Sequence, residues 1–343
     1  MTLRTAAPST ALALATALVL TGCVAGEDAA AEPAATGGTW STDTLEIDFA
    51  TYNPLSLVIK EQGWLEETLG DDVTVTWVQS AGSNKANEAL RAGAIDVGST
   101  AGSAALLARS NGSPIRTIDI YSQPEWAAIV VPEGSDVTSV EDLAGRSVAA
   151  TKGTDPYFFL LQALDEAGVP LDEVEVQNLQ HADGRTALEQ GSVDAWAGLD
   201  PIMAASQAES GTELLYRNID FTTYGFLNAT EEFLEASPDV AQVVVDAYEK
   251  ARAYAQENPQ EVVDILAEVA AIDPAVAETV IVERTNLDVD PVPGDDQRAV
   301  LEVVGPIFVE SGDVSDQAAI DDALGTLFEP TFAEAADPSR VAG

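Results

Sequence analysis

The residues best suited to chemistry lie where predicted helices begin. Three such starts read Asn53-Pro54, Asp155-Pro156 and Asp200-Pro201, and proline directly after a capping residue is a strong signal for the start of a helix. Each start follows a predicted strand, so the free backbone N–H groups of the helix should point into the crevice at the strand ends. Because a helix N-terminus carries about half a positive charge, this pattern predicts binding of an anionic group without any basic side chain.

Small polar residues and glycine gather at comparable strand-to-helix junctions. Lys85 and Lys152, two of the four lysines, also fall at such junctions, where an ammonium would add a charge-assisted hydrogen bond to an anion. The pattern favours reversible binding of a small anionic or zwitterionic solute over catalysis. The residues that we expect to contact this ligand are Tyr52, Asn53, Ser80, Ser83, Asn84, Ser99, Thr100, Gln123, Trp126, Lys152, Gly153, Thr154, Asp183, Trp196 and Asp200.

The polar candidates also have purely structural interpretations. Asp155 and Asp200 are typical helix caps, whereas Asn53 and Ser83 either cap a helix or donate to a ligand. Gly153 would then only permit a tight turn. Both interpretations stay open from sequence alone.

The larger side chains also have both a structural and a ligand-binding interpretation. Trp126 and Trp196 lie either in a core or at the crevice, since tryptophan is rarely fully buried. Lys152 either binds the anion or pairs on the surface with Asp155 or Asp183. His181 is expected to be a loop donor or a surface residue, with a position in the crevice as the alternative.

The composition excludes several classes of protein. The 343 residues include 15 basic and 58 acidic side chains, which gives a formal charge of −43 and argues against nucleic acid or anionic lipid as a partner. One histidine and one cysteine exclude a cysteine–histidine zinc or iron–sulfur centre. The chain also lacks the Gly-x-Ser-x-Gly motif of a nucleophile elbow. We therefore expect neither an enzyme nor a bound cofactor or metal.

The N-terminal segment has the features of an export signal. Arg4 precedes an apolar run over residues 11–20, which is too short to span a bilayer and typical of a signal peptide. The run ends in Leu20-Thr21-Gly22-Cys23, which resembles the bacterial lipobox and implies that Cys23 becomes a lipidated N-terminus. We expect a signal peptide over 1–22, a flexible tether over 23–43 and a protein anchored by lipid outside the cytoplasm.

The rest of the chain alternates strands and helices in two series. Predicted strands cover 45–49, 73–78, 95–98 and 115–120 in the first series, and 148–150, 174–179, 193–197 and 214–216 in the second. Such alternation predicts an α/β fold with parallel sheets. Strands near 125–131 and 222–227 would join two lobes, lobe 1 from 44–126 plus 228–335 and lobe 2 from 127–227. A two-lobed α/β protein binds its ligand in the crevice that faces the strand ends.

The chain resembles the solute-binding proteins of ABC importers for alkanesulfonates, taurine and nitrate. The segments that carry the resemblance are 80–85, 88–98, 151–154, 191–196 and 200–201. It implies a type II periplasmic-binding-protein-like fold, with parallel-sheet lobes joined by two hinge strands. It also implies a monomer that delivers its solute to ABC permease subunits in the membrane, to which lipidated Cys23 would hold it.

Three functions of different classes are open. The first is a solute-binding lipoprotein for a sulfonate-like anion. The second is an enzyme, because the resemblance extends to pyrimidine synthases of thiamine biosynthesis, although those need more histidine and cysteine than this chain has. The third is an acidic surface adhesin, which would leave the polar junctions without a purpose. Gly198-Leu199 and the opening 51–55 depart from the sulfonate pattern, so a pyrimidine or other aromatic solute is an alternative ligand.

Overall fold

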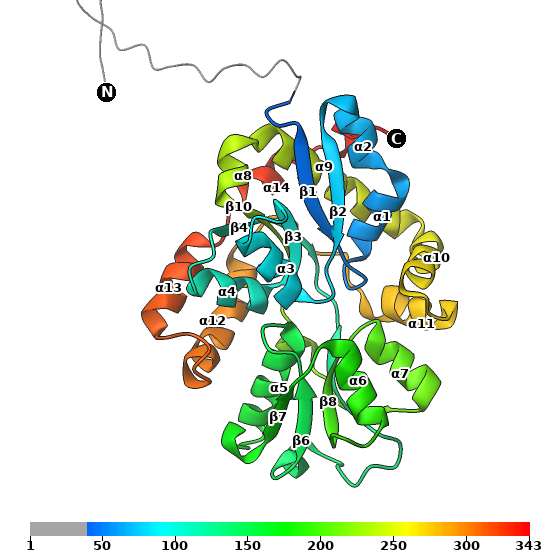
Figure 1. The fold of residues 1–343 in the computed structure, drawn as a ribbon, viewed down its shortest axis with the longest axis vertical. Helices are drawn as coiled ribbons and strands as arrows, with labels where there is room; N and C mark the ends of the chain where they lie inside the picture. The colour runs from blue at the N-terminus through cyan, green and yellow to red at the C-terminus, as the bar shows by residue number, and fades with distance from the viewer. Residues whose placement is uncertain (1–39) are drawn as a thin grey trace, which may run out of the picture. The chain divides into compact units, whose positions relative to one another are not determined.

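The computed structural model describes residues 40–343 and contains two five-stranded sheets, around which the chain forms two lobes (Figure 1). In lobe 1 the strand order is β2-β1-β3-β10-β4, and in lobe 2 it is β7-β6-β8-β5-β9. The predicted signal peptide, Cys23 and the predicted tether up to residue 39 lie outside the described residues. The strands are β1 (Thr44–Phe49), β2 (Thr74–Gln79), β3 (Val97–Ala101), β4 (Ile115–Ser122), β5 (Ala127–Val131), β6 (Ser147–Ala150), β7 (Glu175–Asn178), β8 (Ala195–Leu199), β9 (Glu213–Tyr216) and β10 (Gly225–Thr230).

The expected α/β fold with two lobes is confirmed, but neither sheet is purely parallel. β1 pairs in parallel with β2 and β3, and β6 pairs in parallel with β7 and β8. β10 instead runs antiparallel to β3 and β4, and β5 runs antiparallel to β8 and β9. Both strands begin where the chain crosses from one lobe to the other, next to the ends of the parallel strands. A strand that starts at that edge must run in the opposite direction.

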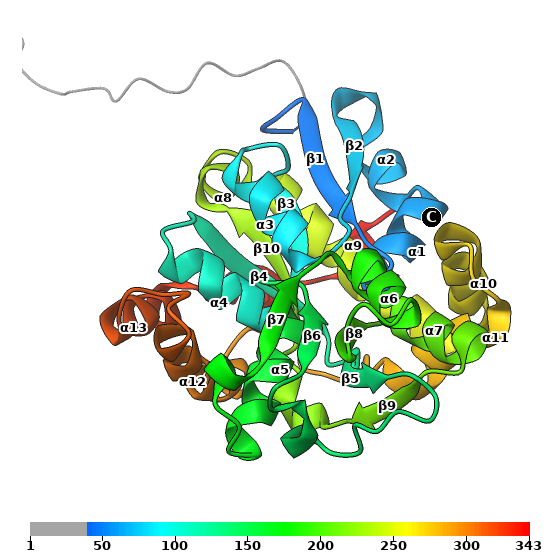
Figure 2. The same ribbon diagram turned by 60° about the horizontal axis from the view of Figure 1, so that its bottom comes forward.

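Helices cover both faces of the sheets. In lobe 2, α6 and α7 lie on one face and α5 on the other (Figure 2). No helix among residues 40–343 is both long and apolar enough to span a bilayer. The helices are α1 (Pro54–Gln62), α2 (Trp64–Leu69), α3 (Ser83–Arg91), α4 (Gly102–Ser110), α5 (Asp155–Glu166), α6 (His181–Glu189), α7 (Ile202–Ser210), α8 (Glu231–Ala236), α9 (Pro238–Glu257), α10 (Pro259–Ala270), α11 (Pro274–Glu278), α12 (Asp295–Glu310), α13 (Gln317–Thr326) and α14 (Thr331–Glu334), with a π-helical turn η5 (Thr279–Arg284) after α11.

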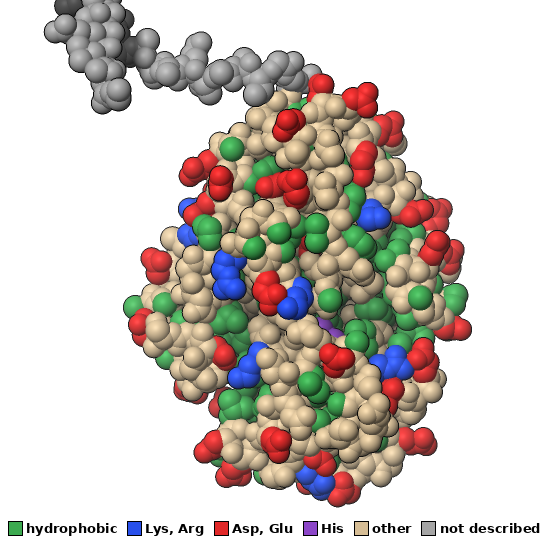
Figure 3. Space-filling view, viewed as in Figure 1, with side chains coloured by type: hydrophobic (Ala, Val, Ile, Leu, Met, Phe, Trp, Pro, Cys, Tyr) green, Lys and Arg blue, Asp and Glu red, His purple; other side chains and the backbone are tan. Residues whose placement is uncertain are grey.

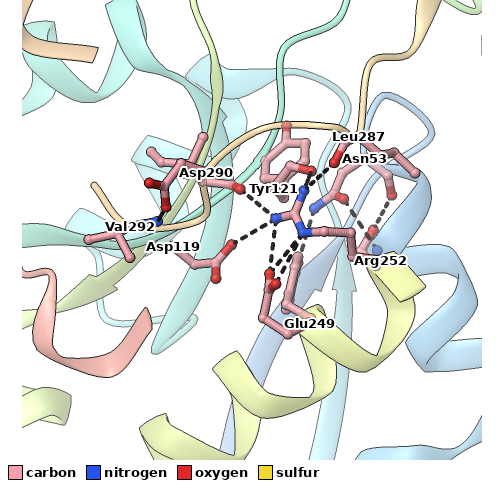
Figure 4. A network of polar contacts seen from close by, with 11 residues as sticks. Asn53, Asp119, Tyr121, Glu249, Arg252, Leu287, Asp290 and Val292 are labelled. Atoms are coloured by element: carbon pink, nitrogen blue, oxygen red, sulfur yellow. Dashed lines mark hydrogen bonds and ion pairs between the residues drawn. The ribbon is translucent and has the colours of Figure 1, made fainter. Parts of the chain in front are cut away.

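The C-terminal third returns to lobe 1, and one buried arginine fixes its position (Figure 4). Arg252 of α9 donates to the carbonyl oxygens of Ile120, Tyr121 and Leu287 at 2.6, 3.1 and 3.0 Å. It also pairs with Glu249 at 2.9 Å and lies 3.7 Å from fully buried Asp119. Burial and the Glu249 charge raise the pKa of Asp119 well above its usual range. Arg252 therefore joins α9, the end of β4 and the segment after η5.

We predict that Arg252→Leu destabilises the protein by about 3–5 kcal/mol, because it leaves the buried carboxyl group of Asp119 and the half-buried one of Glu249 without their cation. Urea denaturation of both proteins measures the difference. Arg91→Leu is the control, since Arg91 is exposed on α3 and its loss should change stability by less than about 0.5 kcal/mol. Equal losses for the two variants would contradict the role assigned to Arg252.

Candidate functional site

The two lobes meet at Asp155, the first residue of α5, which is 1% exposed. One carboxylate oxygen accepts hydrogen bonds from Ser103 Oγ at 2.6 Å and Thr223 Oγ1 at 2.7 Å. The other accepts from Trp126 Nε1 at 2.7 Å and the Thr223 backbone N–H at 2.9 Å. Ser103 belongs to α4 of lobe 1, whereas Trp126 and Thr223 belong to the two connections between the lobes. This carboxylate therefore joins both lobes to both connections.

Asp155 does not have the capping role expected of it. Thr154 is the residue before the helix, and its hydroxyl donates to the Thr151 carbonyl at 2.7 Å. The Asp155 side chain turns instead towards the other lobe, because all four of its donors lie there or in the connections. Burial raises the pKa of Asp155, and the hydrogen bonds oppose that rise.

Two small cavities lie at this junction, one of them lined by Asp155, and each of ≈ 10 Å³ is about large enough for one water molecule. Both are lined by Tyr52 and Trp126, whose rings meet edge to face with centroids 6.1 Å apart. The first also contains Ser83, Ala101, Thr154, Asp155, Pro156 and Leu199. The second also contains Thr51, Pro54, Pro124, Asp200, Val280, Arg284 and Thr285.

A buried ion pair lies at the second cavity. Arg284 of η5 contacts Asp200, at the end of β8, at 3.0 Å and donates to Gln207 at 2.7 Å. Asp200 also accepts from the Ala204 N–H at 2.9 Å and so caps α7. Burial raises the pKa of Asp200 to about 6, and Arg284 opposes that rise. The sequence analysis missed Arg284, because nothing near it in the chain indicates that η5 returns to the strand ends of lobe 2.

A second buried carboxylate organises the strand ends of lobe 1. Asp48 accepts hydrogen bonds from the Ser99 N–H at 2.8 Å and Ser99 Oγ at 3.2 Å, and also from Ser80. Burial raises its pKa to about 7. Tyr52 Oη donates to the Ser99 carbonyl at 2.9 Å. Ser80, Ser99 and Tyr52 are thus brought together, but the hydrogen-bonding groups of both serines already have partners within lobe 1.

Two further candidate ligand-binding residues, Asn53 and Thr100, make their hydrogen bonds within lobe 1. Asn53 caps α1 by accepting from the Ser56 N–H at 3.3 Å and donates to Tyr248 Oη at 3.0 Å. Thr100 Oγ1 accepts from Asn228 Nδ2 at 2.8 Å and donates to the Ala101 carbonyl. Their polar atoms hold α1 and β10 in place.

The start of α3 faces lobe 2 and has no side-chain cap. Ser83 Oγ accepts from the Ala101 N–H at 2.9 Å, while the N–H groups of Ser83 and Asn84 have no partner among residues 40–343. Asn84 Nδ2 lies 3.4 Å from Gln180 Oε1, just before α6. The junction thus brings Ser83 and Thr154 together with Tyr52 and Trp126, whereas Asn84 faces Gln180 and the groove between α3 and α4.

Other candidates lie away from this junction. Trp196 is fully buried in the core between the sheet of lobe 2 and α6 and α7, where it contacts Gly184. The prediction that Trp196 lies at the crevice is wrong, because its position on β8 directs the side chain to the face of the sheet that α6 and α7 cover. Lys152 is exposed, with Nζ 5.3 Å from the centroid of the Tyr157 ring. Asp183 is exposed in the first turn of α6, and half-buried Gln123 contributes a backbone N–H to the Asn286 carbonyl.

Two larger grooves open on either side of the contact between α3 and α6. One of ≈ 490 Å³ lies between α3 and α4 and is lined by Asn84, Arg91 and Gly153, among others. The other, of ≈ 530 Å³, is lined by Thr51 of lobe 1 and Arg185 of α6. Within residues 40–343 no cluster of histidine, cysteine or acidic side chains is arranged to hold a metal ion.

We predict that Asp48→Asn flattens the dependence of stability on pH. With a folded pKa of about 7 against the ordinary 3.8, folded Asp48 holds a proton that the unfolded chain has released. Its contribution to stability is complete below about pH 4 and is lost as the pH rises through 7, by about 1 kcal/mol per pH unit. Urea denaturation from pH 4.5 to 7.5 measures the slope.

Asp183→Asn, at an exposed position, is the control and should keep the wild-type slope. Parallel profiles for Asp48→Asn and the wild type would mean that Asp48 is ionised throughout.

Comparisons with known proteins identify relatives that share this architecture. The chain is 27% identical over 296 residues to the "Putative aliphatic sulfonates-binding protein" of Escherichia coli K12, covering 86% of this chain and 91% of that protein. The solved aliphatic sulphonate binding protein SsuA of E. coli superposes with a TM-score of 0.72 at 25% identity, covering 84% of this chain and 93% of that one. The alkanesulfonate-binding protein SsuA of Xanthomonas axonopodis pv. citri, bound to MOPS, superposes with a TM-score of 0.74 at 24% identity. This match covers 82% of this chain and 98% of that one.

These superpositions confirm the periplasmic-binding-protein fold. The family itself follows from a direct match of sequence. Residues 55–262, more than half of the chain, match the sequence model described as NMT1/THI5 like. The chain therefore belongs to the NMT1/THI5-like family.

Proposed function

We propose that this chain is the extracytoplasmic solute-binding component of an ABC importer and that it captures a small sulfonate between its lobes. The observation that carries the proposal is the polar junction around Asp155, where the uncapped start of α3 meets lobe 2. The relatives named as sulfonate-binding proteins support this assignment. The solute would pass to permease subunits in the membrane.

The start of α3 suits an anion better than the start of α5. Two free N–H groups, of Ser83 and Asn84, add to the partial positive charge of the helix end. At α5 the carboxylate of Asp155 already occupies the first turn. We infer that the sulfonate group binds at α3, and that Thr154, Tyr52 and Trp126 contact the rest of the solute.

The distribution of charge supports an anionic ligand despite the formal charge of −43. Acidic side chains are spread over both lobes, and several basic ones lie across the middle of the face in Figure 3. Arg91 and Arg185 line the two grooves beside the junction. Charges farther away than about 8 Å are screened at physiological salt, so the distant acids have little effect at the junction. Because Arg185 is paired with Glu189 and Glu209, Arg91 is the arginine that favours an anion there.

A sulfonate is larger than either cavity of ≈ 10 Å³ at the junction, so the lobes must separate to admit it. We propose lobes of 44–126 plus 228–335 and of 127–227, which hinge at the connections that contain Trp126 and Thr223. Binding would then shift the population towards the closed arrangement. No step of this cycle requires an enzyme, a cofactor or a second copy of the chain.

A pyrimidine, such as a thiamine precursor, is the second candidate solute. The observation in its favour is the pair of Tyr52 and Trp126 rings at both cavities, which would contact a flat aromatic ring closely. Calorimetry with ethanesulfonate and with 4-amino-2-methylpyrimidine distinguishes the two.

We predict that Gly82→Leu weakens the binding of ethanesulfonate at least tenfold. A Cβ on Gly82 would lie only 3.0 Å from Asn84 Oδ1 and 3.1 Å from His181 Nε2 of the opposite lobe, so a larger side chain keeps the lobes apart. Its φ of 166° is accessible to leucine. Gly325→Leu is the matched control, because a Cβ there meets nothing within 4 Å. Equal affinities of the two variants in calorimetry would mean that the solute does not bind at this junction.

We further propose that lipidated Cys23 anchors the protein to the outer side of the cell membrane, after removal of the signal peptide 1–22 and through the tether 23–43. Cys23→Ser should abolish labelling by radioactive palmitate and release the protein from the membrane. A variant that stays on the membrane after an alkaline wash would refute the lipid anchor.

A further inference from the structure

A third large groove lies between α5 of lobe 2 and α12 of lobe 1, which are neighbours in Figure 1. Its volume of ≈ 590 Å³ is within the range of sites for small molecules. None of the residues around the two junction cavities lines it. The groove is therefore separate from the place where we expect the sulfonate to bind.

The inside of this groove is apolar. Its apolar lining consists of Leu161, Leu164, Val169, Pro170, Leu171 and Ile307. The first three of these are buried, whereas Leu171 and Ile307 are half-buried. Val303, one turn before Ile307 on α12, is 63% exposed and extends the apolar surface beyond the groove. A concave apolar surface in contact with water, rimmed by polar groups, is typical of a binding site.

Only acidic charges surround this apolar surface. Asp165 in the last turn of α5, Asp172 in the segment that follows and Glu310 at the end of α12 line the groove and are exposed. No lysine or arginine lines it. None of the three carboxylates forms an ion pair within residues 40–343. The groove therefore repels anions and attracts a cation that has an apolar body.

Two other occupants do not match this charge. The segment 24–39 of the chain itself contains Glu27, Asp28 and Glu32 and no lysine or arginine. A second copy of the chain carries a formal charge of −43. The acidic rim repels both. A small amine with a hydrophobic body matches the charge, the apolar lining and the volume together.

The two sides of the groove belong to different lobes. Leu164 and Leu171 lie in lobe 2, whereas Ile307 lies in lobe 1. A ligand that contacts both sides binds the arrangement in which the lobes meet more strongly than one in which they have separated. Its binding therefore shifts the population towards the closed arrangement.

We propose that the groove between α5 and α12 is an effector site for a hydrophobic amine. The ammonium group lies among Asp165, Asp172 and Glu310, and the apolar body lies against Leu171 and Ile307. The bound amine favours the closed arrangement of the lobes and so strengthens the binding of a solute in the crevice. This effect on the solute rests on the proposed function, whereas the binding of the amine does not.

The test uses three probes that share one apolar body and differ in charge, namely 4-phenylbutylamine, 4-phenylbutanol and 4-phenylbutyrate. In calorimetry at pH 7.5 the wild type should bind the amine about tenfold more tightly than the alcohol, because each of the three exposed carboxylates adds about a factor of two. The butyrate should not bind measurably, because the same carboxylates repel it.

Neutralising the rim should abolish the preference for the amine and leave the affinity for the alcohol within about twofold of the wild type. The variant combines Asp165→Asn, Asp172→Asn and Glu310→Gln. The matched control makes the same change of charge at exposed positions that do not line the groove and should keep the preference. It combines Glu61→Gln, Asp71→Asn and Glu257→Gln.

A second variant tests the apolar body of the site. Leu171→Ser should weaken the amine and the alcohol alike, by about fivefold, because it removes apolar contact area. Val282→Ser is the control, since Val282 is 58% exposed on η5 and does not line the groove.

The effect on the lobes is measured in two ways. Small-angle scattering without any solute should show a smaller radius of gyration when the amine is bound. With saturating amine, the wild type should bind ethanesulfonate at least about threefold more tightly, and ethanesulfonate should strengthen the binding of the amine by the same factor.

Equal affinities for the amine and the alcohol, or a preference that survives neutralisation of the rim, would overturn the inference. An amine that binds without changing the radius of gyration would also overturn it, as would a lysine-rich peptide that occupies the groove when the amine does not. A failure of ethanesulfonate to bind would overturn the proposed function alone, because the preference for the amine and the scattering still decide the inference.

Discussion

The structure depends on how one buried carboxylate is satisfied. Taking the charge of Asp155 out of water costs several kcal/mol, and the hydroxyls of Ser103 and Thr223, the indole N–H of Trp126 and a backbone N–H offset that cost. These donors come from lobe 1 and from both connections, whereas Asp155 begins a helix of lobe 2. The relative position of the lobes, and hence the shape of the crevice, follows from these hydrogen bonds.

The polar character of the Asp155 junction suits the opening and closing that we propose for the lobes. An apolar contact of the same size would hold the lobes together irrespective of a solute, whereas hydroxyl and amide groups can exchange their partners for water or for a ligand at little net cost. The Asp200–Arg284 pair adds a second contact of this kind. Elsewhere the contact between the lobes is apolar. Phe158 of α5 packs against Phe308 of α12 with ring centroids 4.2 Å apart, within one apolar cluster that extends from Leu45 of lobe 1 into lobe 2.

Local signals explain what could be predicted from the sequence. The alternation of strands and helices and the helix start after Asn53 depend on short-range periodicity and capping, and both agree with the structure. The directions of β5 and β10 could not be predicted, because they depend on where the chain crosses between the lobes. The burial of Trp196 and the place of Arg284 depend on contacts between distant segments. The charge and position of Lys152 in the sequence favour a contact with an anion, but the structure places Lys152 at the surface beside Tyr157.

The most direct test of the central claim, that a solute binds between the lobes at the Asp155 junction, is amide hydrogen exchange with and without ethanesulfonate. Exchange should slow in segments 80–86, 123–127, 151–157 and 178–184, which carry the start of α3, Trp126, Asp155 and His181. Slower exchange confined to the groove between α3 and α4, or no change at saturating solute, would contradict the account.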